Sequence, residues 1–236
     1  MSSRVESLGL DWVSERHLRV LFCAESPDLP VGRLDQAARA IRDAGVAGLS
    51  SVTLAWNSLL LEFDPATPDE DAATATVRAV LSEAWASSND EAWRAVEIPA
   101  CFEGEFAPDV EAVAAYHGMP PSSLVETFCA ALFVVRFVGF CPGFAYLSGL
   151  PSALETPRLS TPRVRVPAGS VGIAGDQAGV YPLATPGGWW LIGRTPRVMF
   201  DARRNPPALL APGDRVRFVP IRADEFHAFQ RTGQHV

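Results

Sequence analysis

The sequence predicts an α+β protein with two domains, a small α/β domain at residues 1–98 and a mostly β domain at residues 99–236. Two observations predict this division. In the first domain, runs rich in β-branched and aromatic residues alternate with runs that have helix periodicity. In the second, short β-prone runs are separated by Gly and Pro at intervals of about 8–12 residues. Hydrophobic residues make up 48% of the 236 residues, which is enough to fill buried cores.

The first domain begins with a predicted strand at residues 18–24, which are rich in β-branched and aromatic side chains. A helix is expected over residues 31–44, where apolar residues recur at helical spacing and Gly45 follows as a C-cap. Residues 51–56 and 59–63 have strand composition and are joined at a short polar turn. These elements give the order β-α-β-β.

A second helix and a further strand complete this domain. Thr67 and Pro68 are typical of a helix start, and the acidic residues after them suit the positive end of the helix dipole. Residues 93–98 have the composition of a strand. The predicted order β-α-β-β-α-β is the split βαβ arrangement of ferredoxin-like domains.

The second domain is expected to contain one short helix at residues 109–116, between Pro108 and Gly118. From residue 132 onward the chain consists of short β-prone runs between turn residues, a pattern typical of a β-barrel or a β-sandwich. The runs are residues 132–140, 163–175, 179–183, 188–193, 197–200 and 214–221.

Charge and composition exclude several classes of function. The net charge is -7, which disfavours nucleic acid as a partner. The sequence contains no lysine, so a Schiff-base lysine, a lysine general base and a phosphate-loop lysine are excluded. There is no apolar run of about 18 residues and no secretory signal pattern, so we expect a cytoplasmic protein without a membrane segment. The four histidines are scattered without metal-ligand spacing, so no metal site is expected.

Residues 139–196 contain more Gly and Pro than an ordinary barrel needs. Glycine weakens strands, so such a cluster indicates either tight barrel corners or a backbone that approaches a ligand closely. The most distinctive segments are GFCPGFAYLSGLP at 139–151, VPAGSVGIAG at 166–175 and TPGGWWLIGRTP at 185–196, with two Thr-Pro-Arg tripeptides between the first two.

These segments resemble the family of allophanate hydrolase subunit 1, which includes the small subunit of prokaryotic 5-oxoprolinase and a Kip-type inhibitor of a histidine kinase. Residues 97–119 and 51–65 are also similar to the family, so the resemblance covers most of the chain. It implies a ferredoxin-like N-terminal domain and a cyclophilin-like β-barrel C-terminal domain.

The resemblance also implies a subunit of an ATP-dependent complex that hydrolyses a lactam such as 5-oxoproline by opening its ring. The chain would form one wall of a site shared with a homologous cyclophilin-like large subunit, with a third hydrolase subunit in the complex, and would be inactive alone. ATP with Mg²⁺ is expected as the cofactor of the complex. The alternatives are a non-catalytic protein that inhibits a histidine kinase, and a subunit that processes allophanate or urea.

Two positions depart from the pattern of this family. Phe102 stands where the family usually has Tyr, and Phe128 stands where it usually has His. The chain therefore lacks a hydroxyl and an imidazole, two groups that can form hydrogen bonds or transfer protons.

The candidate substrate-binding residues have hydroxyl, amide or guanidinium groups that can bind a lactam or an anion. The alternative for the arginines is a surface salt bridge to one of the abundant acids, and the alternative for the tyrosines is a half-buried position in the barrel. The candidates are Tyr146, Arg158, Arg163, Ser170, Gln177, Tyr181 and Arg194.

The candidate site-shaping residues lie in the turns rich in Gly and Pro, where barrel corners and aromatic packing are the alternative. No residue is assigned a catalytic role, because neither Ser170 nor Cys141 has a histidine near it in the sequence to act as its base. The site-shaping candidates are Pro142, Gly143, Phe144, Gly169, Gly175, Gly187, Gly188 and Trp189.

Overall fold

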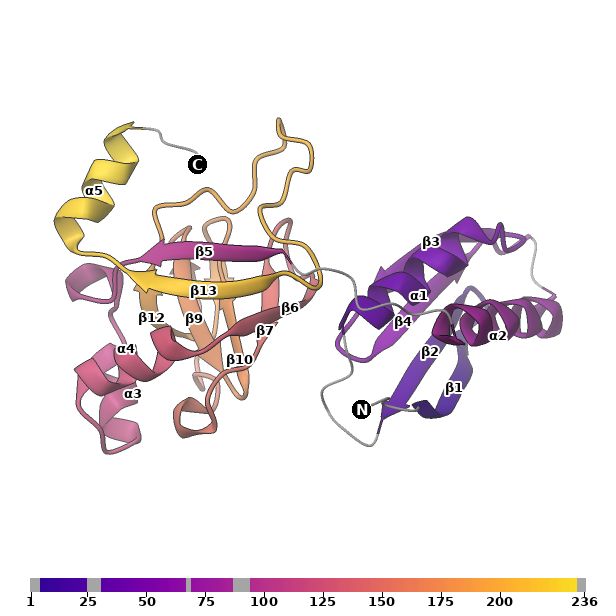
Figure 1. Cartoon of the computed structure of the whole chain (residues 1–236), viewed down its shortest axis with the longest axis horizontal. Helices are drawn as coiled ribbons and strands as arrows, with labels where there is room; N and C mark the ends of the chain where they lie inside the picture. Colours follow the sequence, from indigo (N-terminus) through magenta and orange to yellow (C-terminus); the bar gives the residue numbers. More distant parts are fainter. Residues whose placement is uncertain (1–4, 25–30, 67–68, 87–93, 233–236) are drawn as a thin grey trace. The chain divides into compact units, whose positions relative to one another are not determined.

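The structure is a computed structural model that describes residues 5–24, 31–66, 69–86 and 94–232 (Figure 1). The chain divides into two compact units, Met1–Ala92 and Trp93–Val236. Each unit has a hydrophobic core of its own. None of the helices in the described ranges combines the length and the apolar character that crossing a bilayer requires.

The first unit is a four-stranded antiparallel sheet with two helices packed on one of its faces (Figure 1). The strand order is β1-β2-β4-β3. The elements are β1 (Val5–Ser14), β2 (His17–Ala24), α1 (Val31–Asp43), β3 (Leu49–Leu54), β4 (Ser58–Phe63) and α2 (Glu70–Ala86).

The core of the first unit follows from the spacing of its apolar residues. On β2, Leu18, Val20 and Phe22 are buried and alternate with residues that are exposed or half-buried. On α1, Leu34 and Ile41 lie on the helix face that packs against the sheet. Each fully buried side chain of this size contributes about 1.5–3 kcal/mol of hydrophobic stabilisation.

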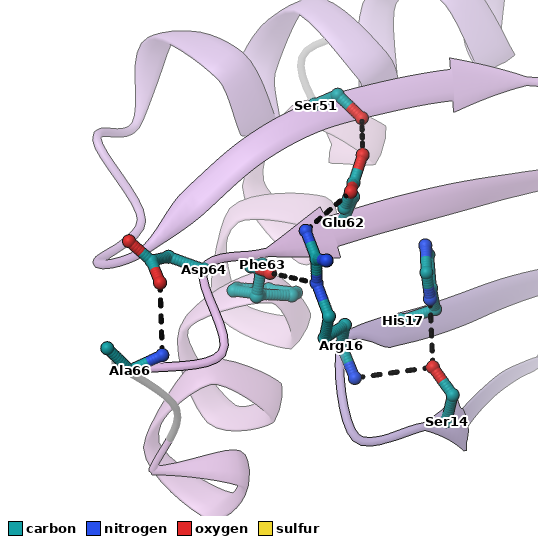
Figure 2. A network of polar contacts seen from close by, with 8 residues as sticks. All are labelled: Ser14, Arg16, His17, Ser51, Glu62, Phe63, Asp64 and Ala66. Carbon is teal, nitrogen blue, oxygen red and sulfur yellow. Dashed lines mark hydrogen bonds and ion pairs between the residues drawn. The ribbon is translucent and has the colours of Figure 1, made fainter.

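A polar network connects the turn between β1 and β2 to the strands β4 and β3 (Figure 2). Arg16 Nη2 forms an ion pair with Glu62 at 2.8 Å, and Arg16 Nε donates to the carbonyl of Phe63 at 3.3 Å. Ser51 donates to the other oxygen of the same carboxylate at 3.2 Å. Because both charged side chains are at least 36% exposed, this ion pair contributes only about 0–1 kcal/mol.

Four predicted elements of the first unit are confirmed to within two residues, namely β2, α1, β3 and β4. The start predicted for the next helix, at Thr67 and Pro68, lies outside the described residues. The helix itself is described from Glu70 onward as α2.

The predicted element order β-α-β-β-α-β is wrong at both ends. It omits β1, whose apolar residues Leu8, Leu10 and Trp12 alternate with polar ones and are only half-buried. Its final strand, predicted at residues 93–98, is β5 (Ala95–Ala100), which belongs to the sheet of the second unit. Strand composition does not specify which sheet a strand joins, because it reports only that the side chains suit a pleated, half-buried surface.

The second unit is built around a seven-stranded sheet with the order β12-β9-β10-β7-β6-β13-β5. The two edge strands of this sheet meet, because the backbones of Cys101 and Arg194 exchange hydrogen bonds of 2.8 and 2.9 Å at the ends of β5 and β12. The sheet is therefore a nearly closed barrel, one of the two forms expected from the sequence. A separate two-stranded sheet pairs β8 with β11.

Helices and short 3-10 turns connect the strands of the second unit, and β5 and β13 lie side by side in parallel (Figure 1). The elements after β5 are η1 (Gly104–Phe106), α3 (Val110–Tyr116), α4 (Pro121–Ala130), β6 (Phe133–Val138), β7 (Ala145–Ser148), η2 (Ser152–Leu154), β8 (Arg163–Val166), β9 (Ser170–Ala174), β10 (Gln177–Val180), β11 (Thr185–Gly187), β12 (Trp190–Arg194), β13 (Arg215–Pro220) and α5 (Ala223–Thr232).

Three features of the second unit differ from the prediction. Helix α4 was not predicted, because two consecutive prolines suggest a break, yet Pro121 lies in the first turn, where the missing N–H costs nothing. Helix α5 was not predicted either, although Ala223, Phe226 and Phe229 recur at helical spacing and Ala223 packs beside the buried Phe226. Residues 197–200 form no strand, and Phe200 makes a single bridge with Ala208.

Candidate functional site

A cavity of about 170 Å³ lies in the second unit, and seven of the candidate residues line it. Four segments that are distant in the sequence form it: the turn before β7 with the start of that strand, the loop before β8, the residue after β10, and the end of β11 with the residues that follow. We call this cavity the aromatic pocket. Its lining residues are Phe140, Phe144, Tyr146, Arg158, Leu159, Pro162, Tyr181, Gly187, Gly188 and Trp189.

The walls of the aromatic pocket are rings packed edge to face. The ring of Phe144 lies 5.2 Å from that of Tyr181 and 5.5 Å from that of Trp189, and all three side chains are buried. Tyr146 is half-buried beside them, 5.8 Å from Trp189. These residues form a hydrophobic cluster separate from the main barrel core, and each such ring pair contributes about 0.5–1.5 kcal/mol beyond its buried area. The walls are therefore rigid before any ligand arrives.

Gly187 is required by this packing. A Cβ atom at this position would lie 2.5 Å from the Tyr181 hydroxyl oxygen, which is closer than van der Waals contact permits. The glycine thus lets the backbone of β11 approach the tyrosine closely. The sequence suggested close approach of the backbone to a ligand, whereas here the backbone approaches a side chain of the pocket wall.

The two tyrosines of the pocket remain protonated at neutral pH. Burial raises the pKa of Tyr181 to about 12, with a hydrogen bond to the Trp189 backbone acting in the opposite direction. Burial also raises the pKa of Tyr146, and the positive charge of Arg158 acts in the opposite direction. Both hydroxyls are therefore available as hydrogen-bond donors rather than as bases.

Arg158 is the one charged residue on the lining of the aromatic pocket. Its side chain is exposed, and its guanidinium carbon lies 6.0 Å from the centre of the Trp189 ring, at the limit of a cation–π contact. None of the ion pairs among the described residues includes Arg158. This guanidinium is therefore available to an anion in the pocket.

The other two candidate arginines have partners within the fold. Arg163 Nη2 forms an ion pair with Asp109 at 2.6 Å, and its Nη1 donates to the Trp189 carbonyl at 3.4 Å. Asp109 is buried and also accepts the backbone N–H of Leu191 at 2.6 Å. Arg194 Nε donates to a backbone carbonyl at 2.9 Å. Neither arginine lines the aromatic pocket.

The remaining candidates lie near the pocket or away from it. Pro142 and Gly143 belong to the turn that carries Phe140, although neither lines the pocket. Ser170 is buried on β9, and Gln177 is half-buried at the start of β10; neither of them lines it. The two other glycines outside the lining are Gly169, which lies in the turn before β9, and Gly175, which lies in the turn between β9 and β10.

The comparisons with known proteins identify the family. A family model described as "Carboxyltransferase domain, subdomain C and D" matches residues 9–210.

The chain belongs to this family.

Two curated relatives of this carboxyltransferase-family chain carry the same name, that of a 5-oxoprolinase subunit. The relative from Bacillus subtilis is 49% identical over 137 residues, which are 58% of this chain and 57% of the relative. The relative from Escherichia coli O157:H7 is 55% identical over 127 residues, which are 54% of this chain and 58% of the relative. The resemblance to the 5-oxoprolinase small-subunit family is confirmed, and the chain spans less than two thirds of the length of these relatives.

Two solved structures have a similar fold. The protein TTHA0988 is 34% identical with a TM-score of 0.73, and the match covers 88% of this chain and 40% of that one. The urea amidolyase of K. lactis is 22% identical with a TM-score of 0.76, and the match covers 95% of this chain and 15% of that one. At this identity the second likeness shows the fold alone. In both proteins the matched region is part of a much longer chain.

The two residues that depart from the family pattern, Phe102 and Phe128, lie at or near a second cavity of about 690 Å³. Phe102 lines this cavity, and Phe128 is buried in the barrel core with its ring 5.8 Å from the ring of Phe102. Neither residue lines the aromatic pocket. Both departures therefore replace a polar group by apolar packing outside the aromatic pocket.

Neither of these two cavities fits ATP with Mg²⁺. The aromatic pocket is smaller than the range of about 300–1,000 Å³ that is typical of larger ligands. The second cavity is lined by three glutamates, which repel phosphate, and its Arg222 is paired with Asp224 at 3.1 Å. Within the described ranges, no group of three His, Cys, Asp or Glu side chains is placed to hold a metal ion.

Phe140, Leu159 and Pro162 line the pocket but were not among the sequence candidates, and neither was Asp109 beside it. Asp109 was expected only as the start of a helix, and its carboxylate instead joins α3 to β8 and β12. Phe140 lines the pocket in a left-handed backbone conformation, with φ at 68°. A signal for Phe140 existed, since it lies between Gly139 and the Pro142-Gly143 pair, but no sequence pattern indicates a positive φ for phenylalanine.

Proposed function

We propose that this chain acts as the small subunit of a 5-oxoprolinase-like complex, which uses ATP to open the ring of a lactam bearing a carboxylate, with 5-oxoproline as the first candidate. The names of the curated relatives support the reaction. The observation that carries the proposal for this chain is the exposed Arg158, which pairs with no acid among the described residues, beside a small pocket with aromatic walls.

The aromatic pocket suits such a substrate in three respects. Its volume of about 170 Å³ is suited to a single small ring, and its aromatic walls favour a flat apolar face. Arg158 can bind a carboxylate with two parallel hydrogen bonds. The protonated hydroxyls of Tyr146 and Tyr181 can donate to the lactam carbonyl, where negative charge increases as the amide is attacked.

The pocket lacks the groups needed to complete the reaction. Its described lining contains no His, Asp or Glu that could act as a general base. The nearby Cys141 is a poor nucleophile, because burial raises the pKa of its thiol. We therefore assign the missing groups, together with the site for ATP and Mg²⁺, to companion subunits.

The expected companions are a homologous barrel subunit that faces the aromatic pocket and a third, hydrolase subunit. The solved structures support this assignment, because TTHA0988 and the urea amidolyase hold the matched region within longer chains. The finer descriptions of the two domains are part of the same proposal: a cyclophilin-like second domain, and a ferredoxin-like first domain in which β1 occupies the sheet edge beside β2 in place of the predicted final strand.

The test is to express the chain with its companion subunits and to measure formation of glutamate from 5-oxoproline together with ATP hydrolysis. We expect coupled turnover by the complex and none by the chain alone. The Arg158→Ala complex should lose most of the turnover, whereas Val164→Ala, at a position that is 89% exposed on β8, should retain it. Turnover by the purified chain alone would contradict the proposal, and co-purification with a histidine kinase instead of a barrel subunit would favour an inhibitor.

A further inference from the structure

Phe140 has a backbone conformation that phenylalanine rarely adopts. Its φ of 68° lies in the left-handed region, where the Cβ of an L-residue meets its own carbonyl, and the N–H of Cys141 donates to the Gly139 carbonyl at 2.8 Å across it. This is a γ-turn of the rare, strained kind. Phe140 is the one residue other than glycine with a positive φ in the described part of the chain.

The turn around Phe140 is fixed by its neighbours. Gly139 donates to the Phe144 carbonyl at 3.0 Å, and Phe144 donates back to the Cys141 carbonyl at 3.0 Å. Gly143 has a φ of 81°, and a Cβ there would lie 2.7 Å from the Cβ of Phe200, so only glycine fits. The surroundings therefore hold the strained residue in one position.

Burial does not account for the strain. The Phe140 side chain is 61% exposed, so most of its apolar surface remains in water. Its ring touches the pocket walls only at their edges, 5.4 Å from the Phe144 ring and 6.4 Å from the Tyr181 ring. A strained, exposed aromatic residue at the mouth of a cavity is typical of a residue kept for ligand binding.

We propose that Phe140 is a specificity-determining clamp that lies over a small ring in the aromatic pocket while Arg158 binds the carboxylate of that ring. The proposal deepens the proposed function and rests on it for the identity of the substrate. The clamp selects small, monocyclic carboxylates, because a pocket of about 170 Å³ leaves room for one ring beneath it. A larger ligand would displace the aromatic side chain.

The test is calorimetric titration of the full chain with two probes, 5-oxoproline and the flat pyrrole-2-carboxylate. Phe140→Ala should bind both about tenfold more weakly, because it loses one ring face and its buried area. Phe140→Tyr should bind within about twofold of the wild-type chain, since it keeps the ring face. Val164→Ala is the matched surface control and should bind like the wild type, because its side chain is 89% exposed and lies outside the pocket lining.

Phe140→Gly separates a clamp from a merely structural residue. Glycine adopts positive φ without strain, so this variant should lose the same affinity while its melting temperature stays constant or rises by about 2–4 °C. A structural role predicts the opposite, a lower melting temperature for both Phe140→Ala and Phe140→Gly. That result would overturn the clamp.

Three further outcomes would overturn the clamp. The first is unchanged affinity of Phe140→Ala for both probes. The second is a Phe140→Ala chain that associates more weakly with the barrel subunit but binds the probes normally, and the third is no binding of either probe by the wild type at millimolar concentrations.

Other outcomes distinguish failure of the clamp from failure of the proposed function. Binding of pyrrole-2-carboxylate but not 5-oxoproline, with the expected loss in Phe140→Ala, would keep the clamp and remove the assigned substrate. Normal turnover of 5-oxoproline by a Phe140→Ala complex would keep the function and remove the clamp.

Discussion

The two Thr-Pro-Arg segments, residues 156–158 and 161–163, have the same sequence and opposite environments. Arg163 is held by the buried Asp109 at 2.6 Å, whereas Arg158 is exposed beside the ring of Trp189 and pairs with no acid among the described residues. The partner that makes the difference lies more than 50 residues away along the chain. A distant carboxylate, rather than the local motif, therefore decides whether an arginine supports the fold or faces a ligand.

The largest expected effect, on stability, comes from removing the carboxylate of Asp109, which pairs with Arg163 but not with Arg158. Asp109→Ala leaves the Leu191 N–H without its acceptor and Arg163 without its ion pair, so we expect the free energy of unfolding to fall by about 2–4 kcal/mol. Urea denaturation measures this change. The control is Asp224→Ala, which breaks an exposed ion pair and should cost less than about 1 kcal/mol. Equal losses in the two variants would show that Asp109 has no special role.

The next effect separates the two arginines directly. Arg158→Ala should weaken binding of a carboxylate ligand by about 10- to 100-fold, the value of a hydrogen-bonded charge, without changing the urea midpoint. Arg163→Ala should lower the urea midpoint and change the affinity less. Titration gives the ligand affinity of each variant, and denaturation gives its urea midpoint. A lower urea midpoint for Arg158→Ala would show that Arg158, like Arg163, supports the fold.

A smaller effect is expected from Tyr181→Phe, which removes one hydroxyl and keeps the aromatic wall. We expect about 2- to 10-fold weaker binding of 5-oxoproline and no loss for a ring without a carbonyl, such as pyrrole-2-carboxylate. The ratio of the two affinities is the measurement. If the affinities for both ligands fall equally, the hydroxyl stabilises the pocket wall and does not donate a hydrogen bond to the lactam carbonyl.

The pH dependence follows from the same tyrosine. Burial raises its pKa to about 12 in the folded chain, so the hydroxyl keeps its proton and ligand binding should not depend on its titration from neutral pH to about pH 10. A folded pKa above the unfolded value means that the stability contribution is complete below about pH 10 and is lost as the pH rises toward 12. Denaturation of the wild type and Tyr181→Phe across this window should show a steeper loss for the wild type.

The smallest effect is expected at the thiol beside the pocket. Because burial raises the pKa of Cys141, it should react slowly with iodoacetamide at pH 7, and Cys141→Ala should keep turnover of the complex within about twofold. Mass spectrometry of the alkylated chain checks the first statement, and turnover of the Cys141→Ala complex checks the second. A loss of more than tenfold in the alanine variant would assign chemistry to this chain that we have assigned to its companions.

The sequence predicted the parts of the site whose signal is local. Short Gly-rich motifs pointed to Phe144, Tyr181 and Trp189, and the structure gathers these residues in one pocket because β-strands return distant turns to the same place. Runs rich in β-branched and aromatic residues likewise predicted several strands, as for β2.

What the sequence could not predict depends on long-range contacts or on backbone strain. The sheet that β5 joins is set by its parallel pairing with β13, and the role of Arg163 is set by Asp109. The left-handed φ of Phe140 has no compositional signal, because the residue is not glycine. Each of these features requires knowledge of what lies opposite in space.

The parallel pairing of β5 with β13 has a consequence for the order in which the protein is made. Both neighbours of β5 come late in the chain, since Arg194 at the end of β12 bridges to Cys101 and β13 begins at Arg215. On the ribosome, β5 emerges long before either neighbour exists, so the barrel closes only when synthesis has passed β13. A nascent chain that stops short of Arg215 would expose a strand edge, and its fate would be aggregation or proteolysis rather than partial activity.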